Sequence, residues 1–204
     1  MDRGIKEIIP EKYVDPNLIV FEEGDVIHTH VLPIGSSHIT SDIAIGLRTT
    51  IDLAEKVKLE YGSALVSEIS KKENIDLAKF DLGETGLVTR MEVAEIIEAR
   101  LCEILELANK ELKRIDRQGL LPAGVVLFGA GAKMPGVVDL TKEILGLPAQ
   151  IGFPQELTGI VDKVDDPAYA TAVGLILWGL DEKIAGGRKK PPLPDFSGIS
   201  QTVS

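Results

Sequence analysis

The chain has 204 residues, enough for one or two domains. Because 44% of the residues are hydrophobic and only 4% are aromatic, any core must be aliphatic. The formal net charge is −10 and no long basic run occurs, so we expect no nucleic acid among its partners. The only cysteine, Cys102, excludes an intramolecular disulfide and fits a packing role better than a catalytic one. Without a signal peptide or a span-length apolar run, a cytoplasmic protein is expected.

The first part of the chain predicts a hairpin followed by a short helix. Residues 1–17 contain two prolines and read as an irregular lead-in. Two apolar strands, Leu18–Phe21 and Val26–Leu32, flank a polar turn, which is a hairpin pattern. A short helix is predicted over Ile39–Leu47, with Ile39, Ile43 and Leu47 on one face.

A second helix is predicted to begin at Thr49 and to end at Gly62. Thr49 and Asp52 form an approximate capping box at its start. Its apolar stripe consists of Ile51, Ala54, Val57 and Tyr61. Glu55 and Lys58 lie off this stripe and three residues apart, so we expect them to be neighbours on the surface.

The middle of the chain predicts a small, mainly β element and then the strongest helix. Residues 63–88 mix short apolar and polar runs with two glycines. Thr89 and Glu92 then form a capping box, and Gly119 is the predicted end of the helix behind it. One face of this helix stays apolar over about five turns. Its members are Ala94, Ile97, Leu101, Ile104 or Leu105, Ala108 and Leu112.

The remaining segments predict a parallel crossover, a last helix and a tail. A strand at Val125–Phe128, a helix from Gly136 to Leu145 and a strand at Ala149–Phe153 have the spacing of such a crossover. Pro167 precedes a helix rich in small residues that extends to residue 180. Residues 185–204 lack apolar periodicity, so a disordered tail is expected.

The turn between the predicted strand at Val125–Phe128 and the predicted helix from Gly136 is the strongest candidate for a functional site. Its small residues let a backbone approach a ligand closely, and the helix behind it directs N–H groups toward the same place. Lys133 lacks the glycine before it and the Ser or Thr after it that a Walker A loop needs. Met134 occupies the place of the third glycine of a dinucleotide fingerprint. A plain tight turn and a surface for adenosine or phosphate remain equal alternatives.

The histidines offer a weaker candidate. His28 and His30 share one strand face and could suit a metal, with His38 the only further ligand evident nearby. Polar residues on a solvated strand are the favoured interpretation, so no metal site is predicted. No nucleophile elbow surrounds any serine, so no Ser-His-Asp triad and no catalytic residue are assigned.

Three blocks of the chain, at residues 31–62, 124–137 and 166–174, together resemble the bacterial cell-division protein family FtsA. The first reads Val31-Leu-Pro-Ile-Gly-Ser-Ser-His-Ile-Thr-Ser-Asp-Ile-Ala-Ile-Gly-Leu-Arg-Thr49 and is joined by Ala54-Glu-Lys-Val-Lys-Leu-Glu-Tyr-Gly62. The second, residues 124–137, is similar to the adenosine segment shared by actin-like ATPases. The third, Asp166-Pro-Ala-Tyr-Ala-Thr-Ala-Val-Gly174, is similar to the closing helix of the family.

This resemblance implies an α/β, actin-like (ribonuclease-H-like) lobe II, with a mixed sheet, flanking helices and a smaller inserted α+β subdomain. Residues 18–47 and 116–184 would form subdomain 2A, and residues 48–115 subdomain 2B. In the family, ATP with Mg²⁺ lies between two lobes. The implied nucleotide contacts are Gly129, Ala130, Gly131, Ala132, Lys133, Glu55 and Lys58.

The family resemblance also implies partners. Family members polymerise, bind the C-terminal tail of FtsZ through subdomain 2B, and tether it to the inner membrane at the division septum. Residues 11–17 lack the glycines of the family's second phosphate loop, so ATP hydrolysis by this chain alone is not expected. Ala130 replaces the usual glycine, and the last residues show no amphipathic membrane helix. A PilM-like pilus-assembly protein, a lobe that binds no nucleotide, and a sugar or acetate kinase lobe remain alternatives.

Overall fold

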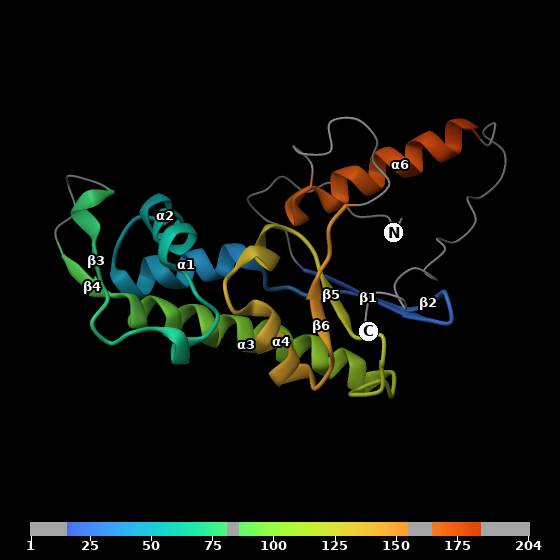
Figure 1. Ribbon diagram of the computed structural model, residues 1–204, viewed down its shortest axis with the longest axis horizontal. Helices are drawn as coiled ribbons and strands as arrows, with labels where there is room; N and C mark the ends of the chain where they lie inside the picture. Colours follow the sequence, from blue (N-terminus) through green and yellow to red (C-terminus); the bar gives the residue numbers. More distant parts are fainter. Residues whose placement is uncertain (1–15, 81–85, 155–164, 185–204) are drawn as a thin grey trace.

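The computed structural model describes residues 16–80, 86–154 and 165–184, and the side chains up to residue 180 (Figure 1). The longest helix, α3 (Arg90–Arg114), runs along the length of the molecule. Two further helices lie at one end of α3, and the hairpin and a parallel strand pair lie toward the other. Within the described residues, no helix is long and apolar enough to cross a membrane.

The predicted hairpin is confirmed. Strands β1 (Asn17–Glu22) and β2 (Asp25–Val31) pair antiparallel, with a register shift after Val20. The turn residues Glu23 and Gly24 have φ of 54° and 92°. Two consecutive positive φ angles match the right-handed twist of the strands, as in a type I′ turn.

Helix α1 (Ser36–Leu47) begins three residues before the predicted start. His38 in its first turn accepts a hydrogen bond at Nδ1 from the Gly35 amide, at 3.1 Å. This contact satisfies a backbone amide at the N-terminus of the helix. Apolar periodicity does not reveal such a contact, so the predicted start was too late. Ile39 and Ile43 are buried as predicted.

Helix α2 (Ile51–Tyr61) is capped by Thr50, so the predicted capping residue Thr49 is wrong by one position. The Thr50 hydroxyl accepts a hydrogen bond from the Leu53 amide at 3.3 Å. The stripe is also partly wrong, because Ile51 is 49% exposed whereas Leu53 is buried.

In the described residues 63–80 and 86–88, less β structure is present than predicted. Strands β3 (Asn74–Asp76) and β4 (Leu87–Thr89) pair antiparallel, and two 3₁₀ helices accompany them. Asp76 ends β3 because its carboxylate accepts a hydrogen bond from the Ala78 amide at 3.1 Å and caps the following turn.

The capping box of α3 is confirmed. The Thr89 hydroxyl accepts from the Glu92 amide at 3.1 Å, and the Glu92 carboxylate accepts from the Thr89 amide at 2.8 Å. The helix ends at Arg114, before the predicted Gly119. Its buried face contains the predicted residues together with Val93 and Glu111, and of the two alternatives Leu105 is buried whereas Ile104 is only partly buried.

The predicted parallel crossover is confirmed. Strand β5 (Val125–Leu127) pairs parallel with β6 (Ala149–Ile151), and α4 (Val137–Leu145) connects them. The last helix, α6 (Ala170–Ile184), follows a 3₁₀ turn at Pro167–Tyr169.

The predicted single mixed sheet is not seen in the part of the chain that the structure describes. There the strands form three two-stranded sheets, β1–β2, β3–β4 and β5–β6. Each ladder is short, and helix packing supplies the continuity instead: one buried cluster extends from Val20 in β1 through α1, α2 and α3 to Leu147. The predicted irregular lead-in at residues 1–17 is wrong at its end, because Asn17 is the first residue of β1, and residues 1–15 lie outside the described residues. The predicted tail at residues 185–204 also lies outside them.

Candidate functional site

The small-residue turn joins β5 to α4 and carries most of the predicted site residues. It begins at Gly129, whose φ of 89° is accessible to glycine but strained for other residues. Ala130–Lys133 then form a 3₁₀ helix, which periodicity did not predict. Ala132 is buried, whereas Ala130, Gly131 and Lys133 are exposed. The exposed face of the turn is therefore mostly backbone and methyl groups.

The segment before α6 fixes the turn. The Gly129 amide donates to the Pro167 carbonyl at 3.0 Å, and Lys133 Nζ pairs with Asp166 Oδ2 at 2.5 Å. Asp166 Oδ1 accepts from the Ala168 amide at 2.9 Å. The hydrogen bond from Lys133, and then that from Ala168, hold the pKa of Asp166 below its usual value. Lys133 is thus engaged in holding the turn.

Gly131 is not required by the packing of the described residues. A methyl group built at Gly131 would meet no atom within 4 Å, and its backbone φ is not in the left-handed region. Gly152 on the strand side is different, because a methyl there would lie 2.2 Å from the Phe128 ring. The turn therefore has a tightly packed inner side and an open outer side.

Glu55 and Lys58, the other predicted site residues, belong to a polar network between α1 and α2. Lys58 Nζ lies 2.7 Å from Glu55 Oε2 and donates to Thr40 Oγ1 at 2.8 Å and to Ser36 Oγ at 3.3 Å. The expectation that both lie on the surface is wrong for Lys58, whose side chain is 7% exposed against 41% for Glu55. Three oxygen partners offset the cost of burying the ammonium group.

The turn and this network are linked through the end of α2. The Ala64 amide donates to the Pro135 carbonyl at 2.8 Å. A methyl group built at Gly62 would lie 3.0 Å from the Met134 sulfur, so the two segments are in close contact. The structure thus joins the start of α4 to the helix that carries Glu55, although no described hydrogen bond connects the network to residues 129–133 directly.

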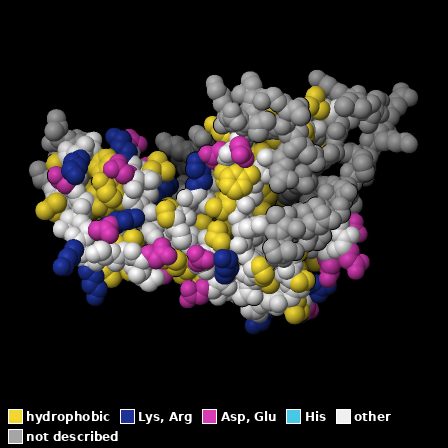
Figure 2. Space-filling model, viewed as in Figure 1, with side chains coloured by type: hydrophobic (Ala, Val, Ile, Leu, Met, Phe, Trp, Pro, Cys, Tyr) yellow, Lys and Arg dark blue, Asp and Glu magenta, His cyan; other side chains and the backbone are white. Residues whose placement is uncertain are grey.

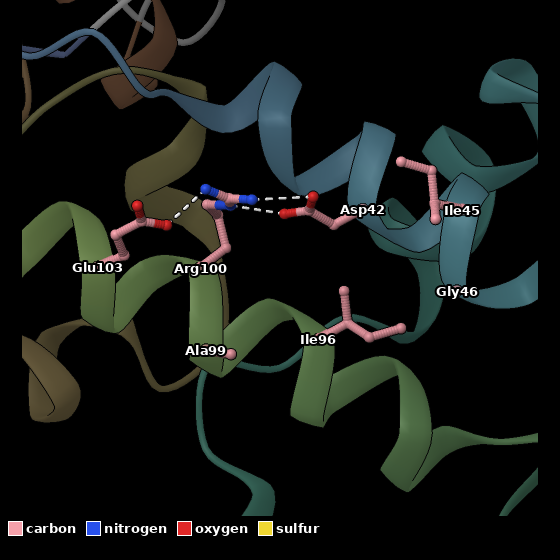
Figure 3. A pocket seen from close by; sticks show the side chains of 7 residues that line it. All are labelled: Asp42, Ile45, Gly46, Ile96, Ala99, Arg100 and Glu103. Carbon is pink, nitrogen blue, oxygen red and sulfur yellow. Dashed lines mark hydrogen bonds and ion pairs between the residues drawn. The ribbon is translucent and has the colours of Figure 1, made fainter.

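A groove that the sequence did not predict lies between α1 and α3 (Figure 3). It has a volume of about 350 Å³ and is lined by Asp42, Ile45, Gly46, Ile96, Ala99, Arg100 and Glu103. Arg100 Nη2 binds Asp42 Oδ1 at 2.9 Å, and this hydrogen bond raises the pKa of Arg100. Asp42 and Arg100 are 58 residues apart, so no local pattern could have signalled this contact.

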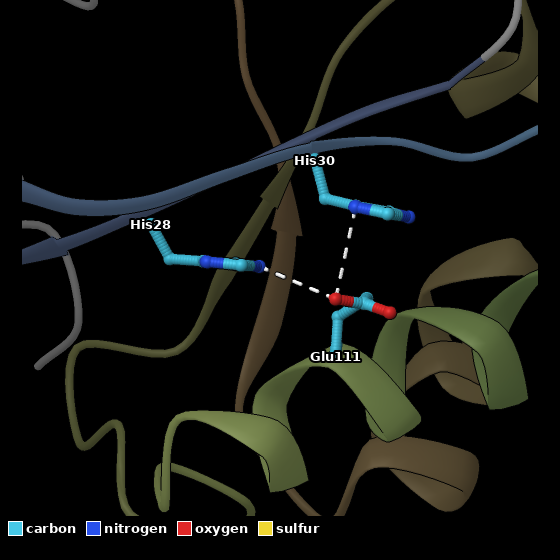
Figure 4. A group of neighbouring side chains, drawn as sticks. All are labelled: His28, His30 and Glu111. Atoms are coloured by element: carbon cyan, nitrogen blue, oxygen red, sulfur yellow. Dashed lines mark ion pairs between the residues drawn. The ribbon is translucent and has the colours of Figure 1, made fainter.

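The histidines are less solvated than expected. His28 and His30 in β2 face Glu111 in the last turns of α3, and the His28 side chain is 22% exposed (Figure 4). The third predicted candidate, His38, is occupied at the start of α1 and does not join them. Elsewhere on the face shown in Figure 2, lysine and arginine side chains are interspersed with aspartate and glutamate.

Sequence comparison identifies the family. The family model of the cell division protein FtsA matches residues 16–174. The FtsA of Pseudomonas aeruginosa is 36% identical over 170 residues, which are 83% of this chain and 41% of the relative. The FtsA of Bacillus subtilis is 38% identical over 172 residues, covering 84% and 38% of the two chains. The chain spans about two fifths of the length of these relatives.

Solved structures agree at the level of fold. MreB 5 of Spiroplasma citri bound to AMPPNP superposes with a TM-score of 0.63 at 16% identity, over 84% of this chain and 52% of MreB. The PilM-PilN type IV pilus biogenesis complex gives 0.59 at 20% identity, over 80% and 42%. The expected actin-like fold is confirmed. The match to the FtsA model, rather than these distant likenesses, settles the family: this chain belongs to the FtsA family of cell division proteins.

Proposed function

We propose that this chain acts as the second lobe of an FtsA-type adaptor that binds ATP and links FtsZ to the cytoplasmic face of the cell membrane at the septum. Residues 18–47 and 116–184 would form subdomain 2A, and residues 48–115 subdomain 2B. Self-assembly into protofilaments belongs to the same proposal. The observation that supports nucleotide binding most strongly is the open outer side of the turn at residues 129–133, since nothing in the described packing calls for glycine at 131.

The exposed turn suits the adenosine part of a nucleotide. A planar base can lie against the backbone and the Ala130 methyl group at residues 129–131 without displacing a side chain. We further propose that Glu55, which is 41% exposed, accepts hydrogen bonds from the ribose, and that Lys58 positions its carboxylate. The MreB relatives were solved bound to AMPPNP and to ADP, which is consistent with this role.

The turn at residues 129–133 does not offer free charged groups to the phosphates of a nucleotide. Lys133 is engaged by Asp166 at 2.5 Å, so neither side chain is available to phosphate or Mg²⁺ without breaking that pair. We therefore assign to this chain the binding and orientation of the nucleoside and no step of hydrolysis. Phosphoryl transfer needs charge stabilisation at the transferred group, which these residues do not provide.

Substitution of Gly131 by Val should weaken ATP binding about tenfold or more, equivalent to about 1.4 kcal/mol, because the branched side chain would occupy the surface proposed for the base. Stability should hardly change, since the outer side of Gly131 is open. Gly86→Val is the matched control, because Gly86 is also open and has no positive φ. Isothermal titration with ATP measures both variants. Wild-type affinity in Gly131→Val, or no heat from folded wild-type protein at millimolar ATP, would contradict nucleotide binding and favour the alternative of a lobe without a nucleotide.

For FtsZ we propose the groove between α1 and α3 as the docking site, with the C-terminal tail of FtsZ as its occupant. Ile45 at the rim is 75% exposed, and the Asp42–Arg100–Glu103 group supplies charges at the opposite end (Figure 3). An apolar anchor beside fixed charges is the arrangement expected of a peptide groove. α3 lies within the proposed subdomain 2B and α1 within the proposed subdomain 2A, so the groove is at the border between the two. A PilM-like role shares the fold, but the family match is to FtsA.

Ile45→Glu should abolish most co-sedimentation with FtsZ polymers, because a carboxylate would replace the apolar anchor. Leu59→Glu provides the matched control, since Leu59 is an equally exposed aliphatic residue, at 76%, on α2. Both substitutions are at the surface and should leave the free energy of unfolding within about 0.5 kcal/mol. Equal pelleting of the two variants would exclude this groove, and no pelleting of the wild-type chain would count against the adaptor role.

A further inference from the structure

We infer that His28, His30 and Glu111 form a binding site for a divalent transition metal ion of the zinc class. The site lies between the β1–β2 hairpin and α3, and none of its residues belongs to the proposed nucleotide turn or the FtsZ groove (Figure 4). Two imidazoles and one carboxylate are a donor set that zinc and related ions bind, usually with water in the remaining position.

The fold brings the three side chains together. Residues two apart on a strand point to the same face, so His28 and His30 project from β2 side by side. Their rings are parallel, with an interplanar angle of 6° and centroids 6.2 Å apart. Both face Glu111, which α3 holds directly opposite the strand (Figure 4).

The distances suit a tetrahedral ion. Glu111 Oε2 lies 3.4 Å from His28 Nε2 and 3.7 Å from His30 Nδ1, and the three ligand atoms lie within 4.8 Å of one another. Zinc–nitrogen and zinc–oxygen bonds of about 2.0–2.2 Å place tetrahedral ligands about 3.3–3.6 Å apart. His30 Nδ1 therefore has to move slightly closer to the Glu111 carboxylate, and the His30 side chain is 36% exposed and can rotate.

His28 carries a second, independent sign of a ligand. Its Nε2 atom is buried and has no hydrogen-bond partner, although it faces the Glu111 carboxylate. A buried polar atom without a partner costs free energy, and coordination to a metal would relieve that cost.

Arg114 holds the carboxylate in place for this role. Its Nη1 donates to Glu111 Oε1 at 2.9 Å, while Oε2 is the oxygen nearest to both imidazoles. A charged carboxylate that is anchored by an outer partner is typical of metal sites.

A bound ion would join the hairpin to α3. The ion pair between Glu22 Oε2 and Arg117 Nη2, at 2.7 Å, already connects the hairpin to the residues just after α3. A metal that binds the folded chain more tightly than the unfolded chain stabilises it by mass action, so ion binding should raise the thermal midpoint.

The test is a titration of the chain with ZnCl₂ by calorimetry, combined with the visible spectrum of added Co²⁺. Wild-type protein should bind one ion, give a Co²⁺ spectrum of a low-symmetry site, and melt at a higher temperature. His30→Ala should weaken zinc binding more than about 100-fold, because outer-sphere partners alone contribute about 10–100-fold. The half-exposed His30 can be replaced without loss of the fold, and Glu111→Gln tests the carboxylate.

Two control variants cover the other strong donors, because the chain has three histidines and one cysteine in all. His38→Ala and Cys102→Ser should bind zinc as the wild type does. Undiminished binding by His30→Ala, loss of binding in either control, or no binding by folded wild-type protein at millimolar zinc would each overturn the assignment.

Discussion

Replacement of Ile97 by Ala is expected to lower the free energy of unfolding by about 2–5 kcal/mol, the range for large buried aliphatic residues. Ile97 is fully buried in the first third of α3. It belongs to the same core cluster as Ile43 of α1 and Val57 of α2, which are also fully buried. A methyl group built at Gly62 would lie 3.2 Å from the Ile97 side chain, so the loop after α2 also packs there.

The size of this effect follows from how little the site can relax. Three helices and a loop surround the side chain, and the cavity left by its removal cannot be filled by the movement of one element. Chemical denaturation followed by circular dichroism measures the loss. Ile45→Ala removes the same atoms from a residue that is 75% exposed and should change stability by about 0.5 kcal/mol or less. Equal losses in the two variants would show that the three helices do not share a rigid core.

The parts of the fold that depend on local sequence were predictable. The face of α3 follows from apolar residues three and four apart, and its start follows from the Thr89–Glu92 box. The strand, turn and helix around residues 125–145 follow from an apolar run, small residues and a renewed helical pattern. The residues that determine each of these segments lie close together in the sequence, so the sequence alone is sufficient to predict them.

The contacts of the candidate sites were not predictable in the same way. Glu111 lies 83 residues after His28, and its place on the buried face of α3 marks it only as an unusual carboxylate. Lys58 was expected at the surface because it lies off the apolar stripe, yet α1 supplies the Thr40 and Ser36 hydroxyls that allow its burial. Such pairs depend on how helices pack against each other, and one sequence read in order does not contain that information.

The turn at residues 129–133 was predictable in part. Its position and its small residues were evident from the sequence, and the family resemblance directed attention to adenosine. The role of Lys133 was not evident, because its partner Asp166 lies 33 residues later. Because Lys133 is paired with Asp166, nucleotide binding at this turn would depend on the backbone and on the shape of its surface. Variants that change this shape without changing the charge are therefore the informative ones.

Gly152→Ala should destabilise the chain by about 1–3 kcal/mol, the usual cost of overpacking. The added methyl would lie 2.2 Å from the Phe128 ring and 2.6 Å from Val126 Cγ1. The Gly152 backbone has little freedom to retreat, since its amide donates to the Leu127 carbonyl at 2.9 Å. The ring of Phe128 must therefore move, and with it the residue that leads directly into Gly129.

This substitution should consequently affect two measurements together. Denaturation should show the loss of stability, and calorimetry should show weaker ATP binding, because the displaced ring changes the inner side of the turn. Gly131→Val should weaken binding alone, and Gly86→Ala, at an open glycine, should change neither by a measurable amount. Normal ATP affinity in a destabilised Gly152→Ala variant would mean that the turn is held by Asp166 and Pro167 and is independent of the β5–β6 pair beneath it. Normal stability would mean that the Phe128 ring has room to rotate, and the packing argument for Gly152 would then be wrong.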